Sequence, residues 1–227
     1  MDFKKIGVVI ADDMEFLPLV ELVTPLGYEK GEINSYETIS FSAGSKEVTA
    51  IKCRIGKVNA ATATAMLIDK IQPDCIMNIG LSGGVKGVNR GTVFAGSSFT
   101  ECDFDLGALG RPLGVKPGQE YVYEADKALL DAIPQEMGIR LLKCGTGDYF
   151  LTKDSQKEEY HKLFGINTFD METGAIASVC HCCDVPFLSI RKVSDDSEDS
   201  AAEDYKKMNA LAETALADIL LEVLKNL

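Results

Sequence analysis

The sequence has no apolar stretch close to the roughly 20 residues that a helix needs to cross a bilayer. It also lacks a basic stripe: 23 Lys and Arg residues stand against 35 Asp and Glu residues. The resulting net charge of −12 disfavours binding to nucleic acid or to an anionic membrane surface. The start of the chain runs directly into a strand-like segment at residues 6–10, without the longer apolar region of a signal peptide. These absences predict a cytoplasmic protein whose partner is a small molecule.

Histidine is scarce, and no pair of cysteines has the spacing of a metal-binding motif. The chain has two histidines and seven cysteines, an odd number of scattered thiols that is typical of a reducing compartment. The densest group is Cys180-His181-Cys182-Cys183. Consecutive residues of a helix point about 100° apart, so these side chains cannot converge on one ion. We interpret the group as structural and expect no metal and no cofactor.

Length and composition are those of one globular α/β domain spanning residues 1–227, since no linker, repeat or low-complexity tract divides the chain. Short apolar segments alternate with helical patterns, which predicts a mixed, largely parallel, twisted sheet flanked by helices on both faces. An antiparallel hairpin is expected at residues 38–53. We expect strands at 6–10, 38–42, 48–53, 75–79, 93–99, 139–144, 168–171 and 186–193, and helices at 15–23, 57–71, 125–133, 154–164, 174–182 and 202–224.

Four polar or glycine-rich segments follow predicted strands. They are residues 11–15, residues 78–84, residues 169–172 and residues 189–195. Open α/β sheets bind ligands at the carboxyl ends of their strands, so these segments are expected to form one site. Singly each is weak evidence, because a carboxylate at a helix start is commonly a cap. Together with residues 55–61 they become specific.

In their order along the chain, these segments resemble those of the bacterial 5′-methylthioadenosine/S-adenosylhomocysteine nucleosidases, members of the nucleoside phosphorylase superfamily. Further matching pieces are residues 73–74, which lead into the glycine-rich turn, and residues 147–150. The resemblance covers roughly two hundred residues. It implies the fold of that superfamily and, as activity, hydrolysis of the N-glycosidic bond of a 5′-substituted adenosine to adenine and the free sugar.

The resemblance also implies roles for individual residues. Asp195 is expected to be the general acid at purine N7, Glu15 the base that activates water, and Arg191 the residue that orients both Glu15 and the water. Cleavage of this bond builds positive charge on the sugar and negative charge on the base, which two such carboxyl groups can stabilise. The other expected substrate contacts are Glu172 and the backbone of Met171 at the ribose, Phe150 and the backbone of Leu151 at the base, and Ile55, Leu81, Ser82, Gly83, Ser194 and Tyr205 around the pocket.

Residues 103–121 form the one long irregular stretch, rich in Gly and Pro. Long loops in compact domains are usually functional or lie at an interface. In the family this loop reaches into the neighbouring subunit's site. The resemblance therefore implies a homodimer, in which Leu109 and Pro117 line the partner's pocket.

Three positions depart from the family near the expected substrate. Leu81 stands where a small hydroxyl residue is usual, so Ser82 is a candidate to hold the water instead. Asp12 stands where an apolar methionine is usual, and Arg54 where glycine is usual. One interpretation makes Asp12 and Arg54 a surface pair. The other makes them recognise a zwitterionic 5′ group, which predicts a preference for S-adenosylhomocysteine over methylthioadenosine.

Two further functions compete with hydrolysis. A nucleoside phosphorylase needs an arginine-rich anion pocket, and the family's phosphorylases place an arginine where this chain has Asn78. Arg54 keeps that alternative open, but water is favoured. A nucleoside-binding sensor that lost its chemistry is compatible with Leu81, although the retained carboxylates argue against it. A receiver-type signalling module is rejected, because no aspartate ends the predicted strand at 75–79.

Overall fold

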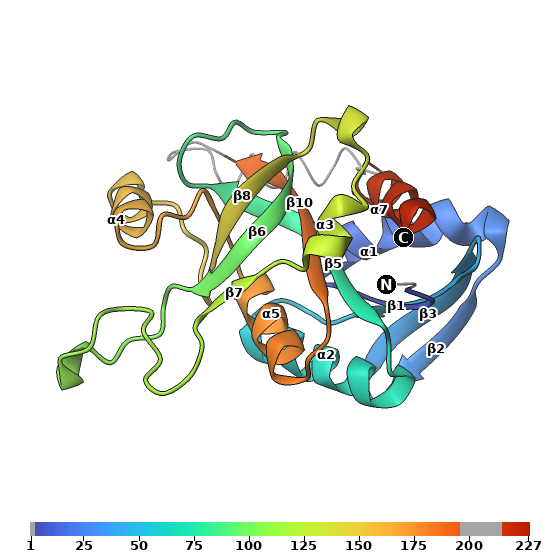
Figure 1. Cartoon of the computed structure of the whole chain (residues 1–227), viewed down its shortest axis with the longest axis horizontal. Helices are drawn as coiled ribbons and strands as arrows, with labels where there is room; N and C mark the ends of the chain where they lie inside the picture. Colours follow the sequence, from blue (N-terminus) through green and yellow to red (C-terminus); the bar gives the residue numbers. More distant parts are fainter. Residues whose placement is uncertain (1–2, 196–214) are drawn as a thin grey trace.

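The chain forms one mixed sheet with helices on both faces in the computed structural model (Figure 1). The structure describes residues 3–195 and 215–227. The described strands are β1 (Lys5–Ile10), β2 (Glu29–Ile33), β3 (Tyr36–Ala43), β4 (Lys46–Lys52), β5 (Cys75–Gly84), β6 (Val93–Glu101), β7 (Val122–Glu124), β8 (Arg140–Thr146), β9 (Thr168–Asp170) and β10 (Phe187–Asp195). The described helices are α1 (Asp13–Val23), α2 (Lys57–Ile71), α3 (Lys127–Asp131), α4 (Asp154–Phe164), α5 (Thr173–Cys182) and α7 (Ala215–Asn226), with 3-10 turns η1 (Thr24–Leu26), η2 (Gly107–Leu109) and η3 (Gln135–Met137).

Strand β5 organises the sheet. It lies parallel to β1 on one side and to β10 on the other, and its last residues pair antiparallel with β9. Strand β10 continues through β6 and β8 back to β9, so these strands and β5 close a ring. From β1 the sheet extends outward through β4, β3 and β2. The carboxyl ends of β1, β5 and β10 thus meet at one edge.

Helices cover the two faces of the sheet and create two separate cores. On one face, α1 and α7 bury residues such as Phe16 and Leu220 against β1, β5 and β10. On the other face, α2 and α5 pack side by side and bury residues such as Leu67 and Ile176 (Figure 1). Strands covered on both faces must be apolar throughout, which is why β1 is buried at every residue after Lys5.

The predicted fold class is confirmed, with differences in detail. The predicted hairpin is formed by β3 and β4, and the helices predicted at 57–71 and 154–164 have the bounds of α2 and α4. Strand β2 was not predicted, because its side chains are almost all exposed and show no apolar alternation. Among the described strands, antiparallel pairings are as numerous as parallel ones, since closing the ring requires β10–β6 and β5–β9 pairs. The expected helix at 202–224 is described from Ala215 onward, and its earlier part lies outside the described residues.

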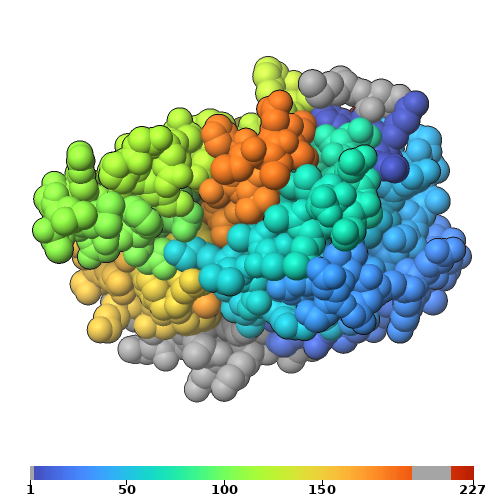
Figure 2. Space-filling view, turned by 90° about the horizontal axis from the view of Figure 1, so that it is seen from below, coloured from blue at the N-terminus to red at the C-terminus, as the bar shows by residue number. Residues whose placement is uncertain are grey.

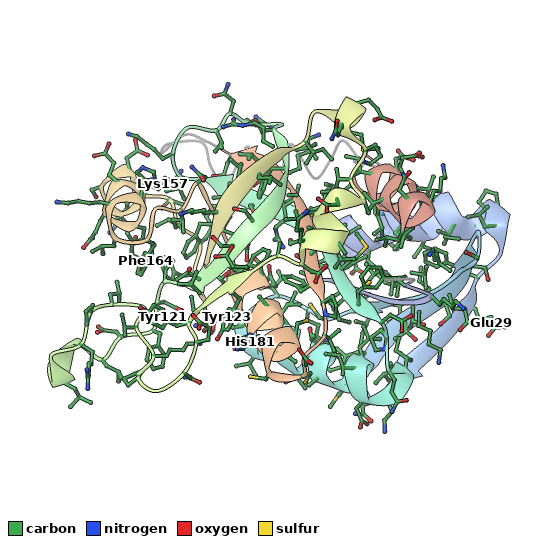
Figure 3. The ribbon with its side chains drawn as sticks, in the orientation of Figure 1. Glu29, Tyr121, Tyr123, Lys157, Phe164 and His181 are labelled. Atoms are coloured by element: carbon green, nitrogen blue, oxygen red, sulfur yellow. The ribbon has the colours of Figure 1, made fainter. Side chains whose placement is uncertain are left out.

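The side chains of residues 180–183, at the end of α5, do not converge on one point at which a metal ion could bind. Cys180 is buried, whereas Cys182 and Cys183 are exposed. The ring of His181 packs against Tyr123, with 5.4 Å between the ring centroids (Figure 3). No cluster of His, Cys, Asp and Glu residues suited to a metal ion occurs within residues 3–195 and 215–227. In the same part of the chain, no helix is long and apolar enough to span a membrane.

Residues 103–121 project from one end of the molecule, where they are drawn in green (Figures 1 and 2). Apart from η2 the segment has no regular structure, as predicted. Leu109, within η2, is 75% exposed in the single chain.

Candidate active site

A cavity of about 290 Å³ opens beside the carboxyl ends of β1, β5 and β10. Residues that were expected from the sequence to form the site supply most of its lining: Asp12, Glu15, Ile55, Leu81, Ser82, Gly83, Phe150, Leu151, Met171, Glu172, Ser194 and Asp195. Ala11, Tyr149, Phe169 and Asp170 complete the lining. The four segments that the sequence singled out therefore do converge on one place.

Glu15 enters the cavity from the first turn of α1. Its Oε1 accepts a hydrogen bond from the backbone N of Leu81 at 2.7 Å, and its Oε2 accepts one from the backbone N of Ala11 at 3.3 Å. This approach requires glycine at position 80, because a Cβ there would lie 2.6 Å from Glu15 Oε1. Gly80 thus allows the helix-borne carboxylate to lie directly on strand β5.

The electrostatic surroundings make Glu15 a weak acid. Burial raises the pKa of Glu15 from 4.5 to about 8, and the negative charges of Asp12 and Glu172 act in the same direction. The guanidinium of Arg191 and the bond from Leu81 oppose this rise. A carboxylate with such a pKa is a stronger base than an exposed one, which suits a group that must take a proton.

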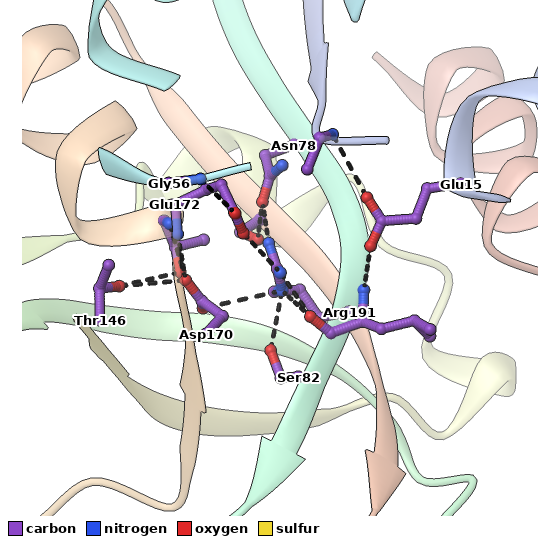
Figure 4. Close-up of polar contacts among 12 residues, drawn as sticks. Glu15, Gly56, Asn78, Ser82, Thr146, Asp170, Glu172 and Arg191 are labelled. Carbon is purple, nitrogen blue, oxygen red and sulfur yellow. Dashed lines mark hydrogen bonds and ion pairs between the residues drawn. The ribbon is translucent and has the colours of Figure 1, made fainter. Parts of the chain in front are cut away.

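Arg191 on β10 is fully buried and is not among the residues that line the cavity; Figure 4 shows its polar contacts. Its Nε donates to Ser82 Oγ at 2.8 Å and its Nη1 to Asn78 Oδ1 at 2.7 Å. Its Nε lies 3.7 Å from Asp170 Oδ2, and its Nη2 lies 3.6 Å from Glu172 Oε2. Burial disfavours the cation, but the charges of Asp170, Glu15 and Glu172 outweigh burial and raise the pKa of Arg191.

Glu172 is held between two elements that are far apart in sequence. Its Oε1 accepts from the backbone N of Gly56 at 3.0 Å, and its Oε2 faces Arg191. Gly56 has a φ of 97°, in the region that favours glycine, and this conformation immediately precedes α2. Burial raises the pKa of Glu172, and Arg191 partly offsets that effect.

Asp170 fixes the backbone that carries Glu172. Its Oδ1 accepts from the backbone N of Glu172 at 2.9 Å, from the backbone N of Thr173 at 2.8 Å and from Thr146 Oγ1 at 3.1 Å. These bonds satisfy the amide groups that open α5. Glu172 is therefore presented by a short, heavily bonded turn rather than by a loose loop.

The glycine-rich segment 78–84, expected to be a turn, lies within strand β5, and its residues Leu81 and Ser82 both bond to Arg191. The carbonyl of Leu81 accepts from Arg191 Nε at 3.2 Å, while the amide of Leu81 holds Glu15. The hydroxyl oxygen of Ser82, considered above as a holder of water, accepts from Arg191. Leu81 thus contributes its backbone to the site, and Ser82 contributes to the position of Arg191.

Asp195 ends β10, where it pairs with Gly83 of β5 and lines the cavity. Its side chain is 0% exposed, and its Oδ2 accepts from Ser194 Oγ at 2.7 Å. The Ser194 hydroxyl also lies 3.3 Å from the carbonyl oxygen of Ser82. A Cβ at Gly83 would lie 3.4 Å from Asp195 Oδ1, so β5 passes close beside this carboxyl group.

Comparison with known proteins agrees with this geometry. Residues 5–225 match the model of the phosphorylase superfamily. The chain belongs to the phosphorylase superfamily. It is 34% identical to a 5′-methylthioadenosine/S-adenosylhomocysteine nucleosidase of Staphylococcus carnosus, covering 98% of this chain and 100% of that protein. A nucleosidase structure from Neisseria meningitidis is 27% identical, with a TM-score of 0.88, and covers 99% of this chain and 100% of that one. A futalosine hydrolase structure from Helicobacter pylori, at 23% identity, has the same fold, with a TM-score of 0.92 over 99% of both chains.

Within this superfamily frame, one predicted pocket residue lies elsewhere. Arg54 has a φ of 71° and is directed away from the cavity. Its Nη2 donates to the carbonyl oxygen of Ser35 at 2.8 Å, and its guanidinium lies 5.1 Å from the centre of the Tyr36 ring. In this position Arg54 does not lie beside the cavity that Asp12 lines, and recognition of a zwitterionic 5′ group by the two residues stays a prediction. Arg54 stabilises the turn before β3 instead.

Three further predicted residues do not line this chain's own cavity. Leu109 and Pro117 lie on the projecting segment, where they were expected to serve a neighbouring subunit. Tyr205 falls outside the described residues. The homodimer and the shared pocket stay predictions.

Asp170 belongs to the segment 169–172 that was expected to form the site, although no role of its own was predicted for it. Its carboxylate accepts from the backbone N of Glu172 and of Thr173, at the start of α5, a capping arrangement that aspartate commonly forms. Tyr149 and Phe169 likewise lie in segments that the sequence singled out, 147–150 and 169–172, without individual roles. Their rings pack against each other with centroids 5.3 Å apart, and Phe169 lies on β9 opposite Gly83 of β5.

Proposed function

We propose that this member of the phosphorylase superfamily hydrolyses the N-glycosidic bond of a 5′-substituted adenosine, releasing adenine and the free sugar. The observation that carries the proposal is the convergence of Glu15, Glu172 and Asp195 on one cavity, with the buried Arg191 3.6 Å from Glu172. The curated relatives that share about a third of the sequence are named as nucleosidases of this kind.

Each carboxyl group has a separate task in this reaction. Glu15 takes a proton from the water that attacks C1′ of the ribose, and its charge stabilises the developing oxocarbenium ion. Glu172 accepts hydrogen bonds from the ribose hydroxyls. Asp195, across the cavity, donates a proton to N7, so that adenine leaves as a neutral base. The positive charge of Arg191 interacts with the carboxyl groups of Asp170, Glu15 and Glu172 and offsets part of their mutual repulsion.

Base stacking and edge recognition complete the proposed substrate site. Phe150 is 45% exposed at the cavity mouth, where its ring can stack on the purine. Leu151, Ile55 and Met171 also line the cavity. In the proposed complex the backbone of Leu151 reads the edge of the base, and Ile55 and Met171 give apolar contact to the sugar and its 5′ group.

Water rather than phosphate is proposed as the nucleophile. Asn78, where the phosphorylases place an arginine, is buried and bonded on both sides of its amide. Its Nδ2 donates to the carbonyl oxygen of Val9 at 2.8 Å, and its Oδ1 accepts from Ser189 and Arg191. No Arg or Lys belongs to the cavity lining formed by the described residues. Such a cavity has no cation with which to bind a phosphate dianion.

Release of adenine is therefore expected in phosphate-free buffer, with free sugar as the second product. Addition of phosphate should change the rate by less than about two-fold, because the described lining residues include no Arg or Lys to bind it. The measurement follows adenine by chromatography with and without phosphate, and assays ribose-1-phosphate derivatives in parallel. Turnover that depends on phosphate and yields the sugar phosphate would assign the protein to the phosphorylases.

The identity of the 5′ group is a separate question, on which Arg54 bears. Because Arg54 is bonded to Ser35, it is not placed to bind the carboxylate of a homocysteine tail. Arg54→Ala is expected to change kcat/KM for S-adenosylhomocysteine and for methylthioadenosine by the same factor, so that their ratio moves less than about three-fold. A ten-fold loss confined to S-adenosylhomocysteine would show that Arg54 turns toward the substrate.

A further inference from the structure

We propose that Asp12 is a positioning residue for Glu15: its carboxylate anchors the start of α1 and places a second negative charge beside the base. This inference rests on the proposed function for its catalytic meaning, but not for the contacts themselves. It concerns a position where this chain differs from the apolar residue usual in the nucleosidases it resembles.

Three hydrogen bonds tie Asp12 to the first turn of α1. Asp12 has an extended backbone, with φ −135° and ψ 178°, and it caps the helix. Its Oδ1 accepts from the backbone N of Met14 at 2.9 Å and of Glu15 at 3.2 Å. Its carbonyl oxygen accepts from the backbone N of Phe16 at 2.9 Å. The amide of the proposed base is thus bonded directly to the Asp12 carboxylate.

The side chain of Glu15 turns back over the same turn. Its Oε2 accepts from the backbone N of Ala11, the residue before Asp12. Residues 11–15 therefore form a closed loop, in which Asp12 holds the backbone of Glu15 and the backbone of Ala11 holds its carboxylate. The hydrogen bond from the backbone N of Leu81 to Glu15 Oε1 then fixes the position of this loop relative to β5. Displacing Asp12 moves the carboxylate of Glu15 relative to the cavity.

Asp12 also acts on Glu15 through charge. The charged and titratable groups that face Glu15 are Asp12 on the preceding turn, Arg191 on β10, Glu172 before α5 and the buried thiol of Cys53 after β4. Burial contributes most to the raised pKa of Glu15, and Asp12 adds to it while Arg191 opposes it. An uncharged residue at position 12 would leave Arg191 less opposed, so Glu15 would become a stronger acid and a weaker base.

Asparagine and alanine separate the two effects. Asp12→Asn keeps a side-chain oxygen that can cap the helix but removes the charge, and Asp12→Ala removes both. Asp126 offers the matched control, since it caps α3 through the same pattern. Its Oδ1 accepts from the backbone N of Ala128 at 2.8 Å and of Leu129 at 3.1 Å, and it does not line the active-site cavity. Asp126→Asn and Asp126→Ala therefore test capping alone.

The experiment measures the pH dependence of kcat/KM for all four variants and the wild type, together with the titration of the Glu15 carboxyl group by carbon-13 NMR. For Asp12→Asn, we expect the acidic limb of the profile and the NMR titration to move to lower pH, with kcat above the limb within about three-fold of wild type. For Asp12→Ala we expect the same shift and a loss in kcat of about ten-fold or more, because the base is no longer held in place. Both alanine variants should lower the midpoint of thermal unfolding, whereas neither Asp126 variant should move the titration of Glu15.

An unchanged Glu15 titration in Asp12→Asn, or an equal shift in Asp126→Asn, would overturn the proposal. If Asp12→Ala does not fold, Asp12→Asn carries the test alone. The NMR titration does not require turnover. A shift in a protein that hydrolyses no adenosine derivative would refute the proposed function while leaving the relation between Asp12 and Glu15 intact.

Discussion

Glu15→Gln is expected to lower kcat for hydrolysis by a factor of about 10² or more, the lower scale for removal of a positioned base. The amide keeps an oxygen that can accept from the backbone N of Leu81, so the first turn of α1 should hold its place. It cannot take a proton from water at any useful pH. Glu21→Gln, at an exposed position on the same helix, is the matched control and should retain full activity.

The same variant should alter the dependence of stability on pH. The pKa of Glu15 rises from 4.5 to about 8 on folding, so the folded state holds this proton more tightly than the unfolded chain. That contribution to the free energy of unfolding is complete below about pH 4.5 and is lost as pH rises through about 8. Wild type should therefore lose stability relative to Glu15→Gln over this interval, as measured by thermal unfolding at several pH values.

Two outcomes would contradict the assignment of Glu15 as the base. One is turnover of Glu15→Gln at a rate near that of the wild type. The other is an acidic limb near pH 8 that persists in the variant, because the limb would then belong to another group.

The arrangement around Arg191 explains how several carboxyl groups can share one small cavity. Its hydrogen bonds go to neutral oxygen atoms of Asn78, Leu81 and Ser82, while the carboxylates lie slightly farther away. Arg191 therefore does not pair with one carboxylate alone, and its charge acts on Glu15, Asp170 and Glu172 together. A buried cation with satisfied donors is a stable centre for such a site, whereas an unpaired one would be costly.

The sequence was informative about elements and about which segments meet, because both follow from local periodicity and from the rule that parallel strands end at one edge. Helices α2 and α4 were predicted at their observed bounds for this reason. The direction of Arg54 could not be predicted, since it depends on a positive φ and on the ring of Tyr36. The role of Asp12 was equally hidden, because a carboxylate beside a cavity and a helix cap have the same sequence pattern.

Closure of the sheet was also beyond local patterns. The pairing of β9 with the end of β5 joins residues that are distant in sequence, with Gly83 opposite Phe169. This contact brings Asp170 and Glu172 to the cavity that Glu15 enters from the other side. The geometry of the proposed active site thus depends on a pairing of only two residue pairs between strands distant in sequence, which local periodicity cannot predict.

Asp195→Asn is expected to lower kcat for adenosine substrates by a factor of about 10² or more, because the isosteric amide cannot supply a proton to N7. The Ser194 hydroxyl, 2.7 Å from Asp195 Oδ2, should hold the amide in the same position, so folding should be preserved. Ser194→Ala keeps the acid and removes only that bond, and it should cost kcat less than Asp195→Asn.

A change of leaving group isolates the acid step. Cleavage of a 4-nitrophenyl riboside releases 4-nitrophenolate, a stable anion that needs no proton to leave, so Asp195→Asn should cleave this substrate at a rate within about ten-fold of the wild type. Glu15→Gln should still be slow with that substrate, because activation of water does not depend on the leaving group. Equal losses on both substrates in Asp195→Asn would mean that Asp195 serves the structure of β10 or the binding of the sugar, and that adenine is protonated by another group.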